Sequence, residues 1–286
     1  MGLGFAVKSI GTKYWMPGDN YLELILEAVR GVVKDGDIIV ISEKALSMAK
    51  GLIIDEREVK PGLLAKFLAR FWMRTVWGYF LGRICRLKPQ NIERLRNYPL
   101  KEGAAHKQVA LWHAGLLGAL LWGSEGGIDA SNLPYSYVSL PLDNPAETAL
   151  EIHLFLRKRL SKWVTVMIVD TDKTYSFRRF HFTHRPRPLR GIHTFFGAFA
   201  YIIGRSLRLK RRSTPLAVAG LRLDAESALE LAEAAHRERG SGAGLTVWDM
   251  AKSFSVELTD VTWNMLKGLR HKPIVVFSPM DQTEKN

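Results

Sequence analysis

The sequence Val-Thr-Val-Met-Ile-Val-Asp-Thr-Asp, residues 164–172, contains the clearest strand of the chain. A continuous apolar run of this length is typical of a buried strand, and we expect the strand to end at Val169. Asp170, Thr171 and Asp172 would then follow it directly. Oxygen ligands at the end of a strand are what magnesium or manganese requires, with the other positions left to water and phosphate. A simple turn is the alternative.

Outward from this strand, the pattern alternates between strands and helices. Towards the N-terminus it predicts strands at Phe5–Ser9 and Ile38–Ile41, with a helix over residues 20–33 between them. Directly before the strand, Asn144 caps a helix to Leu160. Towards the C-terminus, a strand covers Leu216–Leu223, Asp224 caps a helix to Arg237, and Ile274–Phe277 forms a last strand. This alternation predicts an α/β fold of the mixed α+β kind.

Three other groups of polar residues follow apolar elements. Ser42-Glu43-Lys44 ends the second strand and opens a helix through Met48, where free amides and a lysine suit phosphate. In Gly126–Asn132, paired glycines admit a ligand close to the backbone, and Asp, Ser and Asn offer oxygens. Arg178-Arg179 suits a bidentate contact to phosphate or carboxylate. An ordinary helix cap, an Asx turn and a surface arginine pair are the respective alternatives.

The charge balance points to anionic partners. The chain has 286 residues, a formal net charge of +13 and a pI near 9.9. Such a field attracts phosphates, polycarboxylates, nucleic acid or acidic membranes, although it also simply aids solubility. The single cysteine, Cys85, excludes an intrachain disulfide and a cysteine zinc cluster. The first residues lack the features of a signal peptide, and we expect a cytoplasmic protein.

Two apolar stretches are interrupted or followed by basic residues. Leu63–Leu87 contains Lys66, Arg70 and Arg74 at four-residue spacing, and Thr194–Gly204 leads into a run of Arg205, Arg208, Lys210, Arg211 and Arg212. Packing in a core or an oligomer is favoured for both, with attachment to an acidic membrane surface as the alternative.

Residues 60–98 are expected to be helical with a break at Pro89. Val109–Trp122 fits either a hairpin or a buried helix. No nucleic-acid-binding signature is present, so no specific nucleic-acid partner is predicted.

Taken together, these segments resemble the coenzyme F420-0:γ-glutamyl ligase family. The resemblance includes the region from Gly18-Asp19 through Asp35-Gly36-Asp37 to Gly51, and it is most specific at Gly127–Asn132 with Leu140–Asp143. It continues in Ile168–Asp172 and Phe177-Arg178-Arg179, and more weakly in the helix after Asp224 to Gly242. About half of the chain is covered.

The resemblance implies a ligase that uses GTP and Mg²⁺ or Mn²⁺ to join L-glutamate to coenzyme F420-0 or a related acceptor through an acyl phosphate. By position, the metal ligands would be Asp129, Asp170, Thr171 and Glu238, and the nucleotide would contact Gly11, Ser42, Lys44, Asn132, Gly240 and Gly242. Arg178 and Arg179 would be catalytic. The resemblance further implies two subdomains that share the nucleotide and metal site, and a homodimer.

The family domain is expected over residues 1–280, with basic inserts near 57–108 and 181–213 and a frayed tail at 281–286. Departures from the family pattern are Met48, Lys173 and a shortened loop at 239–242. They leave open a paralogue that binds nucleotide, acidic membrane or nucleic acid without catalysis.

Overall fold

Two adjacent parallel strands, β2 (Ile38–Ser42) and β5 (Thr165–Phe177), form the centre of the structure. The structure is a computed structural model and describes residues 4–123, 125–240 and 247–280. A seven-stranded mixed sheet surrounds this pair in the order β1-β9-β2-β5-β6-β7, and β8 pairs with the other side of β5. The outer strands are β1 (Phe5–Thr12), β6 (Phe180–Thr183), β7 (His193–Thr194), β8 (Lys210–Ala219) and β9 (His271–Pro279).

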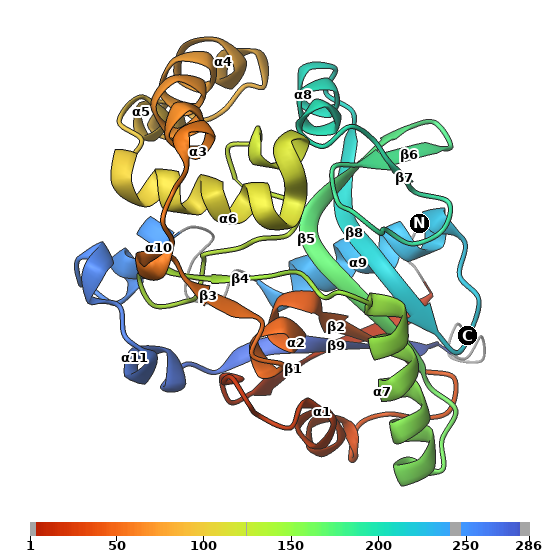
Figure 1. Cartoon of the computed structure of the whole chain (residues 1–286). Helices are drawn as coiled ribbons and strands as arrows, with labels where there is room; N and C mark the ends of the chain where they lie inside the picture. Colours follow the sequence, from red (N-terminus) through yellow and green to blue (C-terminus); the bar gives the residue numbers. More distant parts are fainter. Residues whose placement is uncertain (1–3, 124, 241–246, 281–286) are drawn as a thin grey trace.

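Helices cover both faces of the sheet, because alternate residues of its strands point to opposite faces. Ile39 and Ile41 of β2 pack in one core with α1 (Tyr21–Val29), α2 (Glu43–Ala49) and α7 (Pro145–Leu160). Ile38 and Val40 pack on the other face with α9 (Ala225–Arg239). Figure 1 shows α7 in front of the strands and α9 behind β5 and β8.

The remaining elements form two smaller groups. A two-stranded sheet pairs β3 (Ile53–Asp55) with β4 (Tyr137–Ser139). Near the C-terminus lie α10 (Val247–Ser253), a short 3-10 helix at Leu258–Asp260 and α11 (Trp263–Lys267). Another 3-10 helix covers Glu56–Glu58.

The two basic segments, 57–108 and 181–213, pack against each other. The first contains a continuous helical stretch, α3 (Leu63–Phe67), the π-helical η2 (Leu68–Leu81) and α4 (Gly82–Ile84), followed by α5 (Pro89–Arg96) and the start of α6 (Leu100–Ala119). The second contains α8 (Ala198–Ser206). Met73, Trp77 and Cys85 share a buried cluster with Ala198. These helices gather at one end of the molecule, above the sheet (Figure 1).

Several predicted boundaries were wrong. The strand expected to end at Val169 continues to Phe177, because a β-bulge between Asp170 and Lys173 absorbs the polar residues and pairing with β8 resumes beyond it. The strand expected at Leu216–Leu223 lies earlier, at Lys210–Ala219. The helix expected over residues 20–33 ends at Val29. The break predicted at Pro89 is confirmed, since α4 ends at Ile84 and Pro89 opens α5, and of the two alternatives for Val109–Trp122 the helix is found, over residues 109–119. The predicted tail at 281–286 lies outside the described residues.

Candidate functional site

The carboxyl ends of two parallel strands, β1 and β2, lie beside the middle of a third, β5, where its bulge begins. β1 and β2 each pair antiparallel with β9, so they run parallel to one another and to β5. Gly11 lies near the end of β1, Ser42 ends β2 opposite Val169, and Asp170 follows Val169 in β5. Ligands of open α/β sheets bind at this carboxyl edge of the strands. The fold therefore brings together three positions predicted from separate segments.

A loop that follows α6 brings Asp129 to the same edge. Asp129 is fixed by a pair of backbone hydrogen bonds to Ser139 at the end of β4. Its side chain accepts a 2.7 Å hydrogen bond from the Ser131 amide and forms a 3.0 Å ion pair with Lys44 Nζ, which also donates to Ser131. The next residue, Asn132, has a left-handed backbone (φ 51°), and its carbonyl accepts from the Tyr14 hydroxyl. Lys44, Asp129 and Asn132 thus form one connected group.

The bulge in β5 places the second acidic group. Asp170 pairs with Thr214 and Lys173 with Ser213, so Thr171 and Asp172 have no counterpart on β8. Asp170 Oδ1 accepts a 2.6 Å hydrogen bond from the Thr171 amide, while the Thr171 side chain is exposed. Asp172 is buried and lies 3.2 Å from His184 Nε2. Bulges redirect side chains next to active sites, and this one turns two carboxylates inward.

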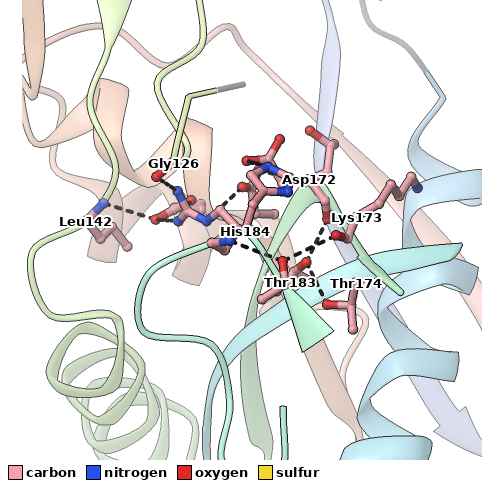
Figure 2. Close-up of polar contacts among 12 residues, drawn as sticks. Gly126, Leu142, Asp172, Lys173, Thr174, Thr183 and His184 are labelled. Carbon is pink, nitrogen blue, oxygen red and sulfur yellow. Dashed lines mark hydrogen bonds and ion pairs between the residues drawn. The ribbon is translucent and has the colours of Figure 1, made fainter. Parts of the chain in front are cut away.

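A buried arginine links the acidic groups. Arg185 Nη2 donates to both carboxylate oxygens of Glu43 at 2.8 and 2.7 Å, and Arg185 Nε lies 3.1 Å from Asp170 Oδ2. Arg185 Nη1 donates to the Gly126 carbonyl, and Glu43 Oε1 also accepts from the Leu142 amide at 3.0 Å. Figure 2 shows Leu142 and Gly126 approaching this group beside the loop that carries His184. Glu43 and Arg185 are 3% and 1% exposed, so a buried ion pair joins the segments around residues 43, 126, 142, 170 and 185.

Gly127 is required by the same arginine. A Cβ on Gly127 would overlap the Arg185 guanidinium, and the glycine has a φ of 101°, which other residues rarely adopt. The paired glycines singled out in the sequence therefore make room for a buried side chain of the protein itself. This explains the glycine without a ligand, although the sequence pattern suggested close approach of one.

The electrostatics of the acidic groups follow from burial. Burial raises the pKa of Glu43, although Arg185 acts in the opposite direction. Burial also raises the pKa of Asp170 well above its usual value, and the charge of Asp172 adds to this effect while Arg185 opposes it. Arg185 is the group that makes it favourable for both carboxylates to carry their charges.

The C-terminal end of α9 adds a further cation. Burial lowers the pKa of Arg239 to about 10, and the charge of Asp170 acts in the opposite direction. Arg239 Nε is buried and has no hydrogen-bond partner among the described residues. Gly240, with a φ of 71°, ends the helix at this point, and the predicted nucleotide contact Gly242 lies outside the described residues. A cation with unsatisfied donors at this edge suits an anionic ligand.

The predicted metal ligands do not form a metal cage in this arrangement. Within residues 4–123, 125–240 and 247–280, no three His, Cys, Asp or Glu side chains are grouped to hold an ion. Asp129 and Asp170 are neutralised by Lys44 and Arg185, and Glu238 is exposed on α9, where it accepts from Ser9 Oγ at 3.2 Å. A divalent ion would need one of the two cations to withdraw. Metal ligation by these residues stays a prediction.

Arg178 and Arg179 lie away from this edge. They form the exposed tip of the hairpin between β5 and β6, eight residues beyond Asp170. At roughly 3.3 Å per residue this is about 25 Å along the strand. They line a separate cavity of about 600 Å³ with His181, Asp224 and Glu226. The placement follows from the unexpected length of β5, and it does not favour the predicted catalytic role.

A second ionic cluster supports the Asp129 loop from the side of the first insert. Glu125 lies 2.6 Å from Lys107 Nζ and 3.2 Å from His106 Nε2, and His106 Nδ1 lies 2.7 Å from Glu56. Lys107 and Glu125 are fully buried. Burial alone would lower the pKa of His106, but Glu56 and Glu125 together raise it to about 10. The protonated imidazole therefore stabilises the segment immediately before Gly126.

We expect the stability of the protein to fall at alkaline pH because of His106. Its folded-state pKa is raised to about 10, above the ordinary value of 6.5, so its contribution is complete below pH 6.5 and is lost as the pH rises through 10. The contribution is on the order of a few kcal/mol. Unfolding free energies measured by denaturant between pH 6 and pH 10 should decline, and His106→Gln should flatten that decline. An unchanged slope in the variant would contradict this account.

Comparison with known proteins identifies the class. The family model described as F420-0:gamma-glutamyl ligase matches residues 9–237, and the chain belongs to this family. An uncharacterized protein of Methanocaldococcus jannaschii is 38% identical over 219 residues, which cover 74% of this chain and 75% of that protein. The coenzyme F420:L-glutamate ligase of Methanopyrus kandleri is 28% identical over 156 residues, which cover 54% of this chain and 55% of that enzyme. The family resemblance found in the sequence is confirmed.

The sequence did not reveal Arg185, Arg239 or the His106 cluster. Arg185 lies in the segment 181–213, where no element could be assigned, and Lys107 and His106 lie in the segment 57–108, where no family motif was found in the sequence. Glu43 was noted only as a neighbour of Ser42 and Lys44. Only a weak signal in the sequence pointed to a buried partner for Glu43. A glutamate that follows a fully apolar strand must be neutralised by another group if it is buried.

Proposed function

We propose that this protein is a GTP-dependent ligase that adds L-glutamate to coenzyme F420-0 or a related acceptor. The observation that carries the proposal is the convergence of Lys44, Asp129, Asn132 and Asp170 where β2 ends beside the bulge of β5. Membership in the F420-0:gamma-glutamyl ligase family supports the reaction class.

The proposed reaction needs no nucleophile from the protein; it needs the substrates to be held in the right positions. A carboxylate oxygen of the acceptor attacks the γ-phosphorus of GTP, and GDP leaves with the electrons of the broken bond. The amine of glutamate then attacks the acyl carbon, loses a proton, and expels phosphate as the amide forms. The protein has to hold anions in line and screen their charge. In the proposal, Lys44 and Arg239 do this, with Ser42, Asn132 and the main chain at Gly11 and Gly240 around the nucleotide.

The finer expectations remain part of the proposal. They are two subdomains that share the nucleotide site, a homodimer, and a requirement for Mg²⁺ or Mn²⁺. The pairing of Asp129 with Lys44 and of Asp170 with Arg185 accounts for the charges without a metal ion, so the metal requirement has to be measured.

The decisive experiment incubates the purified protein with F420-0, L-glutamate and GTP, with Mg²⁺, with Mn²⁺ and with chelator. Product mass and GDP release are followed together. We expect a mass gain of one glutamate residue and one GDP for each amide. Activity that is lost in chelator would support the metal-dependent reaction.

The controls separate the alternatives. GDP release with no mass gain would indicate a different acceptor, which a set of carboxylic acids then identifies. Nucleotide binding without GDP release or product, beside an active reference ligase, would overturn the proposal and support a paralogue that binds nucleotide without catalysis.

A further inference from the structure

Four arginines line a cavity where the two inserts meet. The cavity has a volume of about 380 Å³, and Arg86, Arg205, Arg208 and Arg211 contribute to its walls, with Cys85 beside them. Arg86 follows α4, while the other three span the end of α8 and the start of β8. None of the four forms an ion pair with a carboxylate among the described residues. Their positive charge is therefore available to an anion.

One of the arginines is held in place by the fold. Arg205 donates through Nε to the Cys85 carbonyl and through Nη2 to the Arg86 carbonyl, both at 3.0 Å. The helix that carries it packs very closely on β5, since a Cβ on Gly204 would overlap the Tyr175 ring. Burial raises the pKa of the Cys85 thiol to about 11, so this side chain brings no negative charge at neutral pH. Arg205 is thus a positioned cation in the wall of the cavity, and the exposed Arg86, Arg208 and Arg211 add to its positive charge.

Large apolar side chains stand exposed beside the cavity. Ile84, directly before Cys85 and Arg86, is 51% exposed, and Leu207, directly before Arg208, is 65% exposed. Phe80, one helical turn before Ile84, is 61% exposed. The helices α4 and α8 that carry this region lie next to each other at one end of the molecule (Figure 1). An apolar surface with a cationic pocket in it is the pattern of proteins that bind at a membrane interface.

We propose that this face binds an anionic lipid surface, with a lipid phosphate in the arginine cavity and Phe80, Ile84 and Leu207 in the adjoining apolar layer. Charge selects this occupant. A second copy of the same face would place four arginines opposite four arginines, and like charges oppose that pairing. Nucleic acid would satisfy the arginines but would give the aliphatic side chains of Ile84 and Leu207 no apolar environment. Among the described residues no helix has both the length and the apolar character needed to cross a bilayer, so the proposed contact is with the surface.

The test uses co-sedimentation of the full chain with vesicles of phosphatidylglycerol and phosphatidylcholine, or of phosphatidylcholine alone. We expect binding to the anionic vesicles and at least tenfold weaker binding to the neutral ones. Arg208→Gln/Arg211→Gln should weaken binding about 20- to 30-fold, at roughly fivefold for each basic residue near an anionic surface. Ile84→Ser/Leu207→Ser should weaken it at least tenfold. All four positions are exposed, and thermal unfolding checks that each variant is folded.

The matched control is Arg30→Gln/Lys34→Gln, which removes the same charge from exposed positions near the end of α1, outside the inserts. It should retain binding within about twofold. Equal losses of vesicle binding in the control and in Arg208→Gln/Arg211→Gln would show that net charge alone decides binding, and would overturn the proposed site. Unchanged binding by Ile84→Ser/Leu207→Ser, binding of inorganic phosphate with no vesicle binding, or tighter binding to a DNA or RNA duplex than to anionic vesicles would each overturn the lipid assignment.

Discussion

Replacing Arg185 by methionine is expected to destabilise the fold by about 3–5 kcal/mol, the usual cost of removing one partner of a buried ion pair. Methionine retains much of the volume but leaves Glu43 buried at 3% exposure and removes the counter-charge 3.1 Å from Asp170. Denaturant unfolding at pH 7 measures the loss. The deficit should shrink at low pH, because protonation neutralises the two carboxylates whose pKa burial has raised.

The control for this variant is Arg190→Met, because Arg190 is exposed in the same segment. We expect it to change the unfolding free energy by less than about 0.5 kcal/mol. The double variant Glu43→Gln/Arg185→Met should be more stable than Arg185→Met alone, since it no longer buries an unpaired charge. If Arg185→Met costs less than about 1 kcal/mol, the arginine does not carry the role assigned to it.

The proposed ligase reaction is expected to slow by about 100-fold in both Asp129→Asn and Lys44→Met. Lys44 Nζ lies 3.0 Å from Asp129, and loss of either charge displaces the other group from the proposed nucleotide site. Misplacement by about 1 Å is enough for an effect of this size. Because the two residues act as a pair, the double variant should be about as slow as each single one, and not 10⁴-fold slower. Single-turnover product formation measures the three rates.

The same pair distinguishes a metal ligand from a structural carboxylate. If Asp129 binds the metal, Asp129→Asn should need more Mg²⁺ for half-maximal rate, and Lys44→Met should need less, because a competing cation is gone. Asp143→Asn, an exposed control in the segment before α7, should match the unaltered protein. Identical Mg²⁺ dependence in all four proteins would remove Asp129 from the predicted ligand set.

The elements with strong local signals were predictable from the sequence. The strand at Ile38–Ile41 is a continuous apolar run, and the structure confirms it. The helix to Leu160 begins after a capping asparagine, Asn144, and is confirmed as well. The family was also predictable, because its motifs occur in order along the chain.

What depended on distant contacts could not be predicted. The continuation of β5 through three polar residues is decided by pairing with β8, which lies about 40 residues later. The burial of Arg185 depends on Glu43, which is 142 residues away in sequence. Local propensity contains no information on either event, so the position of Arg178 and Arg179 at a hairpin tip was unexpected as well.

The ionic cluster around Glu125 has a consequence for any attempt to shorten the chain. The segment 57–108, predicted from the sequence to be an insert, supplies Lys107 and His106, the cations that neutralise Glu125. Deletion of residues 57–108 would leave that carboxylate buried beside Gly126, whose carbonyl accepts from Arg185. The insert is therefore not a removable module. A shortened form of this chain without residues 57–108 would therefore need Glu125 replaced first.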